Sequence, residues 1–141
     1  MRFSLTSRIR AVPDAVRELR EVVGFAAAMA GFGHGAGEEI RLAVNEALAN
    51  VVKHGYGGDV DGPIRLRIRA SVSLVEIVIV DECRPIRPDE ICPRSLDDVR
   101  PGGLGVHMMR KLMNVVEYRP RVGRGNALRM IRTSPEIEQE P

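Results

Sequence analysis

Hydrophobic and polar residues alternate in several short stretches of the chain, a pattern typical of β-strands. Residues 3–10 alternate apolar side chains with serine, threonine and arginine, which predicts a half-exposed opening strand. The alternation returns at 64–70, where arginines separate the apolar residues, so one face of this strand should be buried and the other wet. Residues 74–80 are almost continuously apolar and end at Asp81, which predicts a more central strand. A final hairpin is expected from strands at 115–119 and 127–133.

Apolar residues at helical spacing predict three helices. The first should begin at Pro13–Asp14 and end near Ala30, before a run of glycines. The second should begin around Glu38–Glu39, whose charge suits a helix N-terminus, and reach about His54. Its expected core stripe is Ile40, Val44, Leu48 and Val51 or Val52. The third should begin at the glycine turn 102–105, with Leu104, Met108, Leu112 and Val115 on one side.

This order of elements predicts an α+β fold. We expect a two-layer α/β sandwich in which helices pack on one face of a mostly antiparallel sheet. Residues 84–101 are rich in proline and lack a sustained period, so they should form an ordered loop or a mobile lid. A single domain is expected over residues 1–133, followed by a disordered acidic tail at 134–141.

Composition narrows the class of protein. The formal net charge of the 141 residues is only +2, and the arginines are scattered among acids, which gives no argument for direct nucleic-acid binding. The longest apolar run is too short to span a bilayer, and the N-terminus lacks the apolar core of a signal peptide. Cys83 and Cys92 alone exclude a disulfide framework and a four-cysteine zinc site. A reduced, cytoplasmic protein without a membrane segment is expected.

Three polar side chains share one face of the second expected helix. Glu46, Asn50 and His54 are spaced four residues apart, so they project from the same side. An amide oxygen at Asn50 is a suitable hard ligand for Mg²⁺, and a carboxylate one turn earlier could take a proton from an attacking hydroxyl or water. Lys53 could meet a phosphate as a point charge. On spacing alone, an ordinary exposed face with an i,i+4 hydrogen bond is the commoner explanation, since such polar pairs are frequent on helices.

Two further features carry possible chemistry. Asp81 ends the apolar strand, where its carboxylate could accept a hydrogen bond from an exocyclic amine such as that of adenine, or could simply terminate the strand. Gly102-Gly103-Leu104-Gly105 precedes a helix, and glycines there let backbone amides approach a phosphate. The turn is neither a P-loop nor a dinucleotide fingerprint, and caps and tight turns use the same residues.

Together, the order and separation of these motifs resemble the GHKL ATPase superfamily. Within it, the segments 42–50, 53–56, 102–113 and 125–128 are similar to those of the anti-sigma-factor serine kinases. The resemblance covers the chain from about Phe3 to Thr133. It implies the Bergerat ATP-binding fold and a homodimer.

The resemblance also assigns roles to individual residues. It implies that Asn50 holds Mg²⁺ and that Glu46 is the general base. Asp81 would bind the adenine amino group, and Gly103 and Gly105 would line the phosphates of ATP. The neighbouring residues that it adds to the ATP site are Lys53, His54, Cys83, Gly102 and Leu104. Proteins of this kind sequester a sigma factor and phosphorylate a serine on an anti-anti-sigma protein, a STAS-domain protein.

One residue departs from the family pattern. Cys83 stands in Asp81-Glu82-Cys83, where the resemblance expects glycine, and a Cβ there hinders close approach of a ligand. This motivates an alternative function, a nucleotide-binding or degenerate partner-switching module without kinase activity. On the first expected helix, Arg17, Arg20 and Glu21 could contact a sigma factor; they could equally form a solvated face with ion pairs such as Arg17–Glu21.

Overall fold

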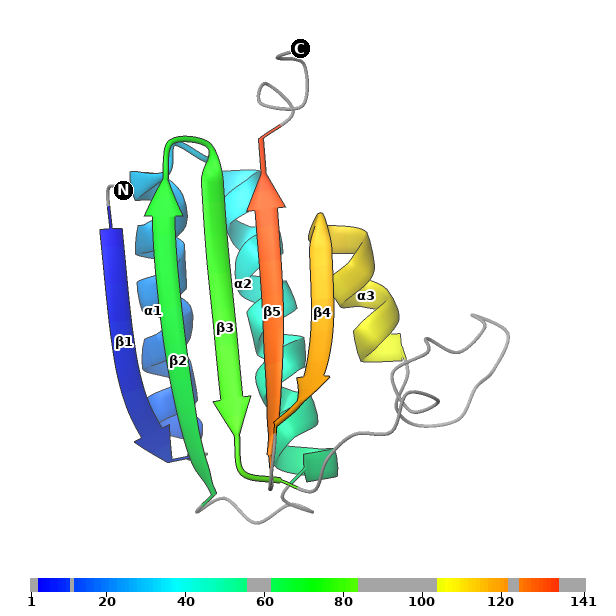
Figure 1. Cartoon of the computed structure of the whole chain (residues 1–141). Helices are drawn as coiled ribbons and strands as arrows, with labels where there is room; N and C mark the ends of the chain where they lie inside the picture. The colour runs from blue at the N-terminus through cyan, green and yellow to red at the C-terminus, as the bar shows by residue number, and fades with distance from the viewer. Residues whose placement is uncertain (1–2, 11, 56–61, 84–103, 122–124, 135–141) are drawn as a thin grey trace.

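A computed structural model describes residues 3–10, 12–55, 62–83, 104–121 and 125–134 (Figure 1). Within these ranges, five antiparallel strands form one sheet in the order β1-β2-β3-β5-β4. The strands are β1 (Phe3–Arg10), β2 (Pro63–Ser71), β3 (Leu74–Asp81), β4 (Val115–Pro120) and β5 (Asn126–Thr133). The helices are α1 (Pro13–Met29), α2 (His34–Asn50) and α3 (Leu104–Leu112), with a π-helical turn η1 (Val51–Gly55) continuing α2.

The described helices all lie on one face of the sheet; the opposite face, on which no described helix packs, is called the open face. Figure 1 shows α1 behind β1 and β2, α2 behind β3 and β5, and α3 beside β4 at the edge. The strand alternation selects the covered face, since Ile64, Leu66 and Ile68 of β2 are buried while the arginines between them are exposed. The two-layer α+β fold and its mostly antiparallel sheet, expected from the sequence, are thus confirmed.

The expected start of the second helix is wrong by four residues. Gly33 is the extended residue before α2, and the helix begins at His34 instead of at Glu38. Glycine has a weak helix propensity, and tertiary packing overrides it here. A methyl group on Gly37 would lie 3.8 Å from Cβ of Ala27, so α1 approaches the first turns of α2 closely. The expected end near His54 corresponds to the π-helical turn.

The expected core stripe of α2 is confirmed, whereas the apolar side expected for α3 matches its buried side only in part. Ile40, Val44 and Leu48 are fully buried on α2. On α3 and just after it, the buried side chains are instead those of Val106, Met109 and Met113. Met108 is 39% exposed and Leu112 half-buried, and Val115 already belongs to β4. Both apolar sets fit the helical period, so the packing partners of α3 decided which set faces inward.

Arg132 of β5 ties two helices to the sheet. Its guanidinium pairs with Oε2 of Glu39 on α2 at 2.8 Å and donates to the Leu112 carbonyl at the C-terminal end of α3. Carbonyls in the last turn of a helix have no partner within the helix, and a cation there also complements the helix dipole. This contact fixes α3 relative to α2, on which the site described below depends.

Two sequence expectations lie outside the described residues: the loop or lid at 84–101 and the acidic tail from residue 135 onward. In the described part of the chain, no helix is long and apolar enough to cross a membrane.

Candidate functional site

The polar face at the end of α2 meets the start of α3. A methyl group placed on Gly105 would lie 3.0 Å from Oε2 of Glu46 and 3.4 Å from both Nδ2 and Oδ1 of Asn50. The first turn of α3 therefore packs against the carboxylate and the amide that the sequence singled out. A side chain at residue 105 would have to displace them, which explains the glycine at this place.

Asp81 is held in place at the end of β3. Its side chain faces the helix layer and is only 6% exposed. Oδ1 accepts hydrogen bonds from the backbone N–H of Cys83 at 2.9 Å, the backbone N–H of Asn126 at 3.2 Å and Nδ2 of Asn126 at 3.3 Å. Asp81 and Asn126 are directly opposed in the β3–β5 ladder. Three donors on one oxygen fix the orientation of the carboxylate.

Gly125 closes the backbone around this carboxylate. Its φ is +91°, and a methyl group there would overlap the Asp81 carbonyl oxygen. Its N–H donates to the Cys83 carbonyl at 2.9 Å, so the β3 end and the start of β5 are joined on both sides of Asp81. Only glycine combines this left-handed conformation with this close approach.

Cys83 occupies its place without backbone strain. Among the described non-glycine residues, only Ser73 has a positive φ, so Cys83 does not adopt a left-handed conformation. Its side chain is buried in the core, away from solvent. The departure from glycine therefore leaves the local backbone ordinary, and its effect is limited to the volume of the side chain.

Tyr118 of β4 connects the two halves of the site. Its side chain hydrogen-bonds with Asn50, and the charges of Asp81 and Arg110 affect the pKa of its hydroxyl. Burial raises the pKa of the Tyr118 hydroxyl; the contact with Asn50 lowers the pKa, the charge of Asp81 raises it, and that of Arg110 lowers it. One phenol is thus influenced by both the α2 amide and the strand-end carboxylate.

The structure brings together some of the predicted site residues and leaves others undescribed. Glu46, Asn50 and Gly105 form one cluster, and Tyr118 links it to Asp81. Leu104 is the first residue of α3, Lys53 is exposed on η1, and the backbone of His54 lies in the same turn. Gly102 and Gly103, and the side chains of His54 and Leu104, lie outside the described residues.

Two of the contacting residues, Tyr118 and Asn126, have no role that the sequence predicts. The sequence signal for Asn126 is its position directly after a glycine at the start of an expected strand. In the structure Asn126 is 3% exposed, and a buried polar side chain needs hydrogen-bond partners. Tyr118 gave no signal. Its contact with Asn50 depends on the β4–β5 register, which local patterning does not determine.

The proposed partner surface on α1 has different ion pairs from those expected. Glu21 pairs with Arg41 of α2 at 2.7 Å, and Arg17 lies 4.0 Å from Asp14. The Nε atom of Arg20 is buried without a hydrogen bond. Glu21 therefore joins the two helices, instead of pairing along α1 with Arg17.

Comparison with known proteins agrees with this geometry. Residues 9–132 match the family model described as the histidine kinase-like ATPase domain. The chain is 26% identical to the serine-protein kinase RsbW of Bacillus subtilis over 124 residues, covering 82% of this chain and 78% of the relative. It is 30% identical to RsbW of Listeria innocua over 125 residues, covering 83% of this chain and 80% of the relative.

Two solved structures share the fold. The RsbU and RsbW domains of Rv1364c from Mycobacterium tuberculosis match with a TM-score of 0.64 and 21% identity. That match covers 93% of this chain and 32% of the other, so this chain spans about a third of that protein's length. The catalytic domain of the histidine kinase ThkA matches with a TM-score of 0.55 and 11% identity, covering 92% and 95% of the two chains.

Proposed function

Because the chain belongs to the histidine kinase-like ATPase family, in the branch of the RsbW serine-protein kinases, we propose that it transfers the γ-phosphoryl group of ATP to a serine of a partner protein. The observation that carries this proposal is the contact of Gly105 with both Glu46 and Asn50. It joins a glycine turn suited to phosphates, a hard oxygen ligand and a carboxylate base at one point.

We assign Mg²⁺ binding to Asn50. The side-chain oxygens of Asn50 and Glu46 both lie against Gly105, and oxygen donors are what this cation prefers. Bound Mg²⁺ would neutralise charge on the phosphates and orient the γ-phosphoryl group. Tyr118, by contacting Asn50, would hold the amide in one orientation.

Glu46 is the proposed general base. Its carboxylate would accept the proton of the serine hydroxyl while the serine oxygen bonds to the γ-phosphorus. The bond between the γ-phosphorus and the bridging oxygen breaks, and ADP leaves with that electron pair. The packing of Gly105 against Oε2 keeps the carboxylate at the start of α3, where the phosphates are expected.

Asp81 is the proposed adenine ligand. All three hydrogen-bond donors that the described residues offer Asp81 use Oδ1, so we assign Oδ2 to the exocyclic amine of the base. A carboxylate that is already oriented loses little freedom when the base binds. Cys83, two residues further on and buried, is assigned to the wall of this part of the site.

The phosphates are assigned to the N-terminal end of α3 and to the residues that precede it. Gly102, Gly103, Leu104 and Gly105 would present backbone amides, and the helix dipole favours an anion at that end. Lys53 and His54 on η1 are the further candidates for phosphate contact.

The proposed partners are a sigma factor, which the protein would sequester, and an anti-anti-sigma protein of the STAS class, which would carry the target serine. The similar proteins of Bacillus and Listeria are named serine-protein kinases, which supports the second of these partners. A homodimer in the cytoplasm, without direct contact to nucleic acid or membrane, completes the proposal.

The decisive experiment is a transfer assay with purified protein, radiolabelled ATP and the anti-anti-sigma protein encoded nearest its gene. Glu46→Gln should slow the transfer by about 100-fold or more, because proton abstraction is lost, while ATP affinity measured by calorimetry stays close to that of the wild type. Asn50→Ala should abolish the Mg²⁺ dependence of ATP binding. Unchanged transfer in Glu46→Gln would exclude this residue as the base.

The alternative function, a module that binds nucleotide or a partner without phosphoryl transfer, rests on Cys83. Its buried side chain occupies volume that glycine would leave open. Under this alternative, the wild type binds ATP and its partner but transfers no phosphate. If the Cys83 side chain limits binding, Cys83→Gly should tighten ATP binding in calorimetry; identical affinities would remove the reason for this alternative.

A further inference from the structure

The open face of the sheet gathers most of its charge in arginines. Seven arginines point away from the helices, and they are found on four strands: Arg8, Arg10, Arg65, Arg67, Arg69, Arg119 and Arg129. We call this set the arginine face. On the same side of the described strands, the acidic residues are Glu76 and Glu117. Seven positive charges thus stand against two negative ones on this face, although the whole chain has a net charge of only +2.

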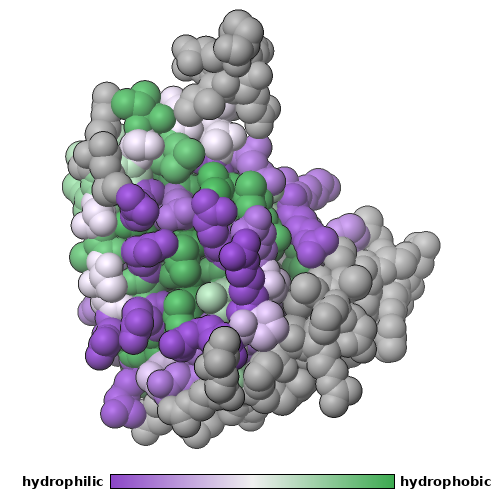
Figure 2. Space-filling model, in the orientation of Figure 1, coloured by the Kyte–Doolittle hydropathy of each residue, from purple (hydrophilic) through white to green (hydrophobic). Residues whose placement is uncertain are grey.

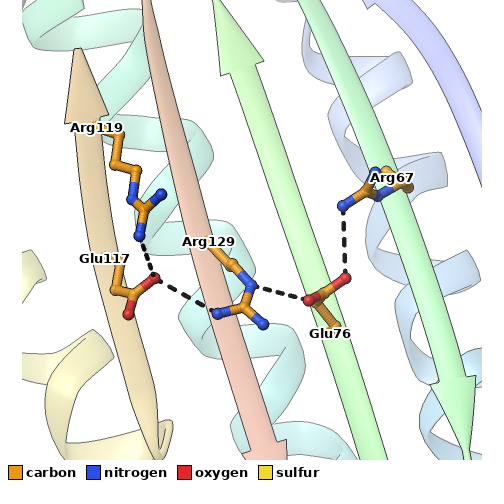
Figure 3. A network of polar contacts seen from close by, with 5 residues as sticks. All are labelled: Arg67, Glu76, Glu117, Arg119 and Arg129. Carbon is orange, nitrogen blue, oxygen red and sulfur yellow. Dashed lines mark hydrogen bonds and ion pairs between the residues drawn. The ribbon is translucent and has the colours of Figure 1, made fainter. Parts of the chain in front are cut away.

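The two glutamates of this face are already paired. Figure 3 shows one chain of contacts across β4, β5, β3 and β2. Arg129 donates to Glu76 at 2.9 Å and to Glu117 at 3.5 Å. Arg119 lies 3.9 Å from Glu117, and Arg67 lies 3.6 Å from Glu76. Both carboxylates on this face therefore already have arginine partners: Arg119 and Arg129 on β4 and β5, and Arg67 on β2.

Three arginines at the β1–β2 side, Arg8, Arg65 and Arg69, lack this compensation among the described residues. Arg8 lies directly opposite Arg65 in the β1–β2 ladder, a like-charge pair that destabilises a sheet. Arg69 opposes Glu76, but the carboxylate of Glu76 is taken by Arg129 and Arg67. Within the described residues, no ion pair joins Arg8, Arg65 or Arg69 to a carboxylate. These three guanidinium groups form a positive patch beside the free edge of the sheet.

Aliphatic side chains fill the centre of the face. Val78 and Val80 of β3 and Ile131 of β5 are half-buried between the charged residues. Figure 2, in the orientation of Figure 1, shows hydrophobic residues interspersed with hydrophilic ones over the sheet. An apolar centre bordered by arginines is a composition typical of protein interfaces, in which arginine is enriched.

We propose that the arginine face is a docking surface for an acidic protein partner. Carboxylates of the partner would pair with Arg8, Arg65 and Arg69, and its apolar side chains would cover Val78 and Ile131. The residues of the nucleotide site point to the opposite, helix-covered side of the sheet, as the burial of Asp81 shows. A partner on the open face therefore leaves the ATP site accessible, and the two sites can be occupied together.

Other occupants fit this surface less well. A nucleic acid would bring phosphates against the paired carboxylates of Glu76 and Glu117, and the described open-face positions hold no aromatic ring on which a base could stack. A second copy of the chain, face to face, would oppose two surfaces that each carry an excess of positive charge. An acidic protein with an apolar patch satisfies both the charge and the aliphatic centre.

The test uses the full chain and a fluorescein-labelled synthetic helical peptide with a stripe of leucines flanked by glutamates on the same face. Binding is followed by fluorescence anisotropy at several salt concentrations. In Arg65→Glu/Arg69→Glu the affinity should fall about tenfold or more, because two attractions become repulsions. Lys111→Glu, which reverses an exposed cation in the last turn of α3, away from the arginine face, should leave the affinity unchanged.

Further arms separate the alternatives. The neutral variant Arg65→Gln/Arg69→Gln should also bind the peptide more weakly than the wild type. Its circular dichroism spectrum should match that of the wild type, which shows that the loss of binding is not a loss of folding. ATP affinity should be the same in all variants, so failure of this proposal and failure of the kinase proposal are distinguishable. Equal peptide binding by wild type and the charge-reversed variant would overturn the proposal. So would tighter, arginine-dependent binding of single-stranded DNA or phosphatidylserine vesicles, or self-association in ultracentrifugation that the charge reversal abolishes.

Discussion

Gly105, in the first turn of α3, lies against the carboxylate of Glu46 on α2: a methyl group at residue 105 would be 3.0 Å from Oε2. These two residues are 59 positions apart in the sequence, and their contact joins the expected phosphate end of α3 to the expected base. A substitution at residue 105 can therefore change ATP binding while leaving the stability of the fold nearly unchanged.

Gly105→Ala should weaken ATP binding without destabilising the protein. Alanine is the better helix former, by roughly 0.5–1 kcal/mol in a helix interior, which opposes any cost of displacing the flexible ends of Glu46 and Asn50. We expect a thermal midpoint near that of the wild type and an ATP affinity about tenfold lower by calorimetry. Gly35→Ala is the matched control, because nothing lies within 4 Å of a methyl group there. If both variants bind ATP equally well, Gly105 has no special role.

Gly125→Ala should be strongly destabilising. The left-handed φ of +91° costs a residue with a Cβ about 1–2 kcal/mol, and the overlap with the Asp81 carbonyl adds to this. Gly31→Ala is the control: its φ is +89°, but nothing lies within 4 Å, so it carries the conformational cost alone. Urea unfolding of the two variants measures the difference. Equal losses of stability would mean that β5 can shift away from Asp81 at little cost.

Arg129→Met should destabilise the protein more than Arg119→Met. The side chain of Glu76 is 13% exposed, and Arg129 donates to its Oε2 at 2.9 Å; the hydrogen bond also raises the pKa of Arg129. Removing Arg129 leaves a poorly solvated carboxylate with one remaining contact, to Arg67 at 3.6 Å. Arg119 is 80% exposed and 3.9 Å from Glu117, where an ion pair contributes little. The denaturant midpoints of the two variants test this order of stability. A lower midpoint for Arg119→Met than for Arg129→Met would contradict the proposed importance of the Arg129–Glu76 contact.

The stability of the nucleotide-free protein should fall at high pH through Tyr118. Burial raises the pKa of its hydroxyl above the ordinary value of 10.0, so the folded state binds this proton more tightly than the unfolded state does. The contribution is complete below pH 10 and is lost as the pH rises through the folded-state pKa. Absorbance of phenolate in Tyr56→Phe, which keeps Tyr118 alone, should therefore rise later than in the urea-unfolded chain. Both titrations are made in EDTA, which removes Mg²⁺. If Tyr118 ionises at the same pH in the folded and in the unfolded protein, its hydroxyl is not buried in solution.

Much of the fold was predictable from local pattern. The alternation at 64–70 and the apolar run at 74–80 identified β2 and β3, because a two-residue period marks a half-buried strand and a short apolar run marks a central one. The first turn of α2 and the inward face of α3 were not predictable. Gly35 and Gly37 argue locally against a helix, and the methionine-rich α3 has two apolar stripes, so only packing against neighbours could decide.

The candidate site shows the same division. Glu46 and Asn50 share a helix face by their spacing alone, and Asp81 ends its strand by position. Their partners Asn126 and Tyr118 come from the last hairpin, and the contacts require the register that sets Asn126 opposite Asp81 and Tyr118 opposite Leu128. Side chains distant in sequence meet only when strand order and register are set, and local periodicity carries no information on either.

The sequence by itself thus determined the elements, the one-sided burial of the sheet and the types of residue available for nucleotide chemistry. The tertiary structure decided which of them meet: Gly105 with Glu46, Asn50 with Tyr118, and Asp81 with Asn126. It also gathered arginines that look scattered along the chain onto one open face, because alternate residues of neighbouring strands point the same way. Periodicity is a local property, whereas charge on a surface depends on which strands are neighbours.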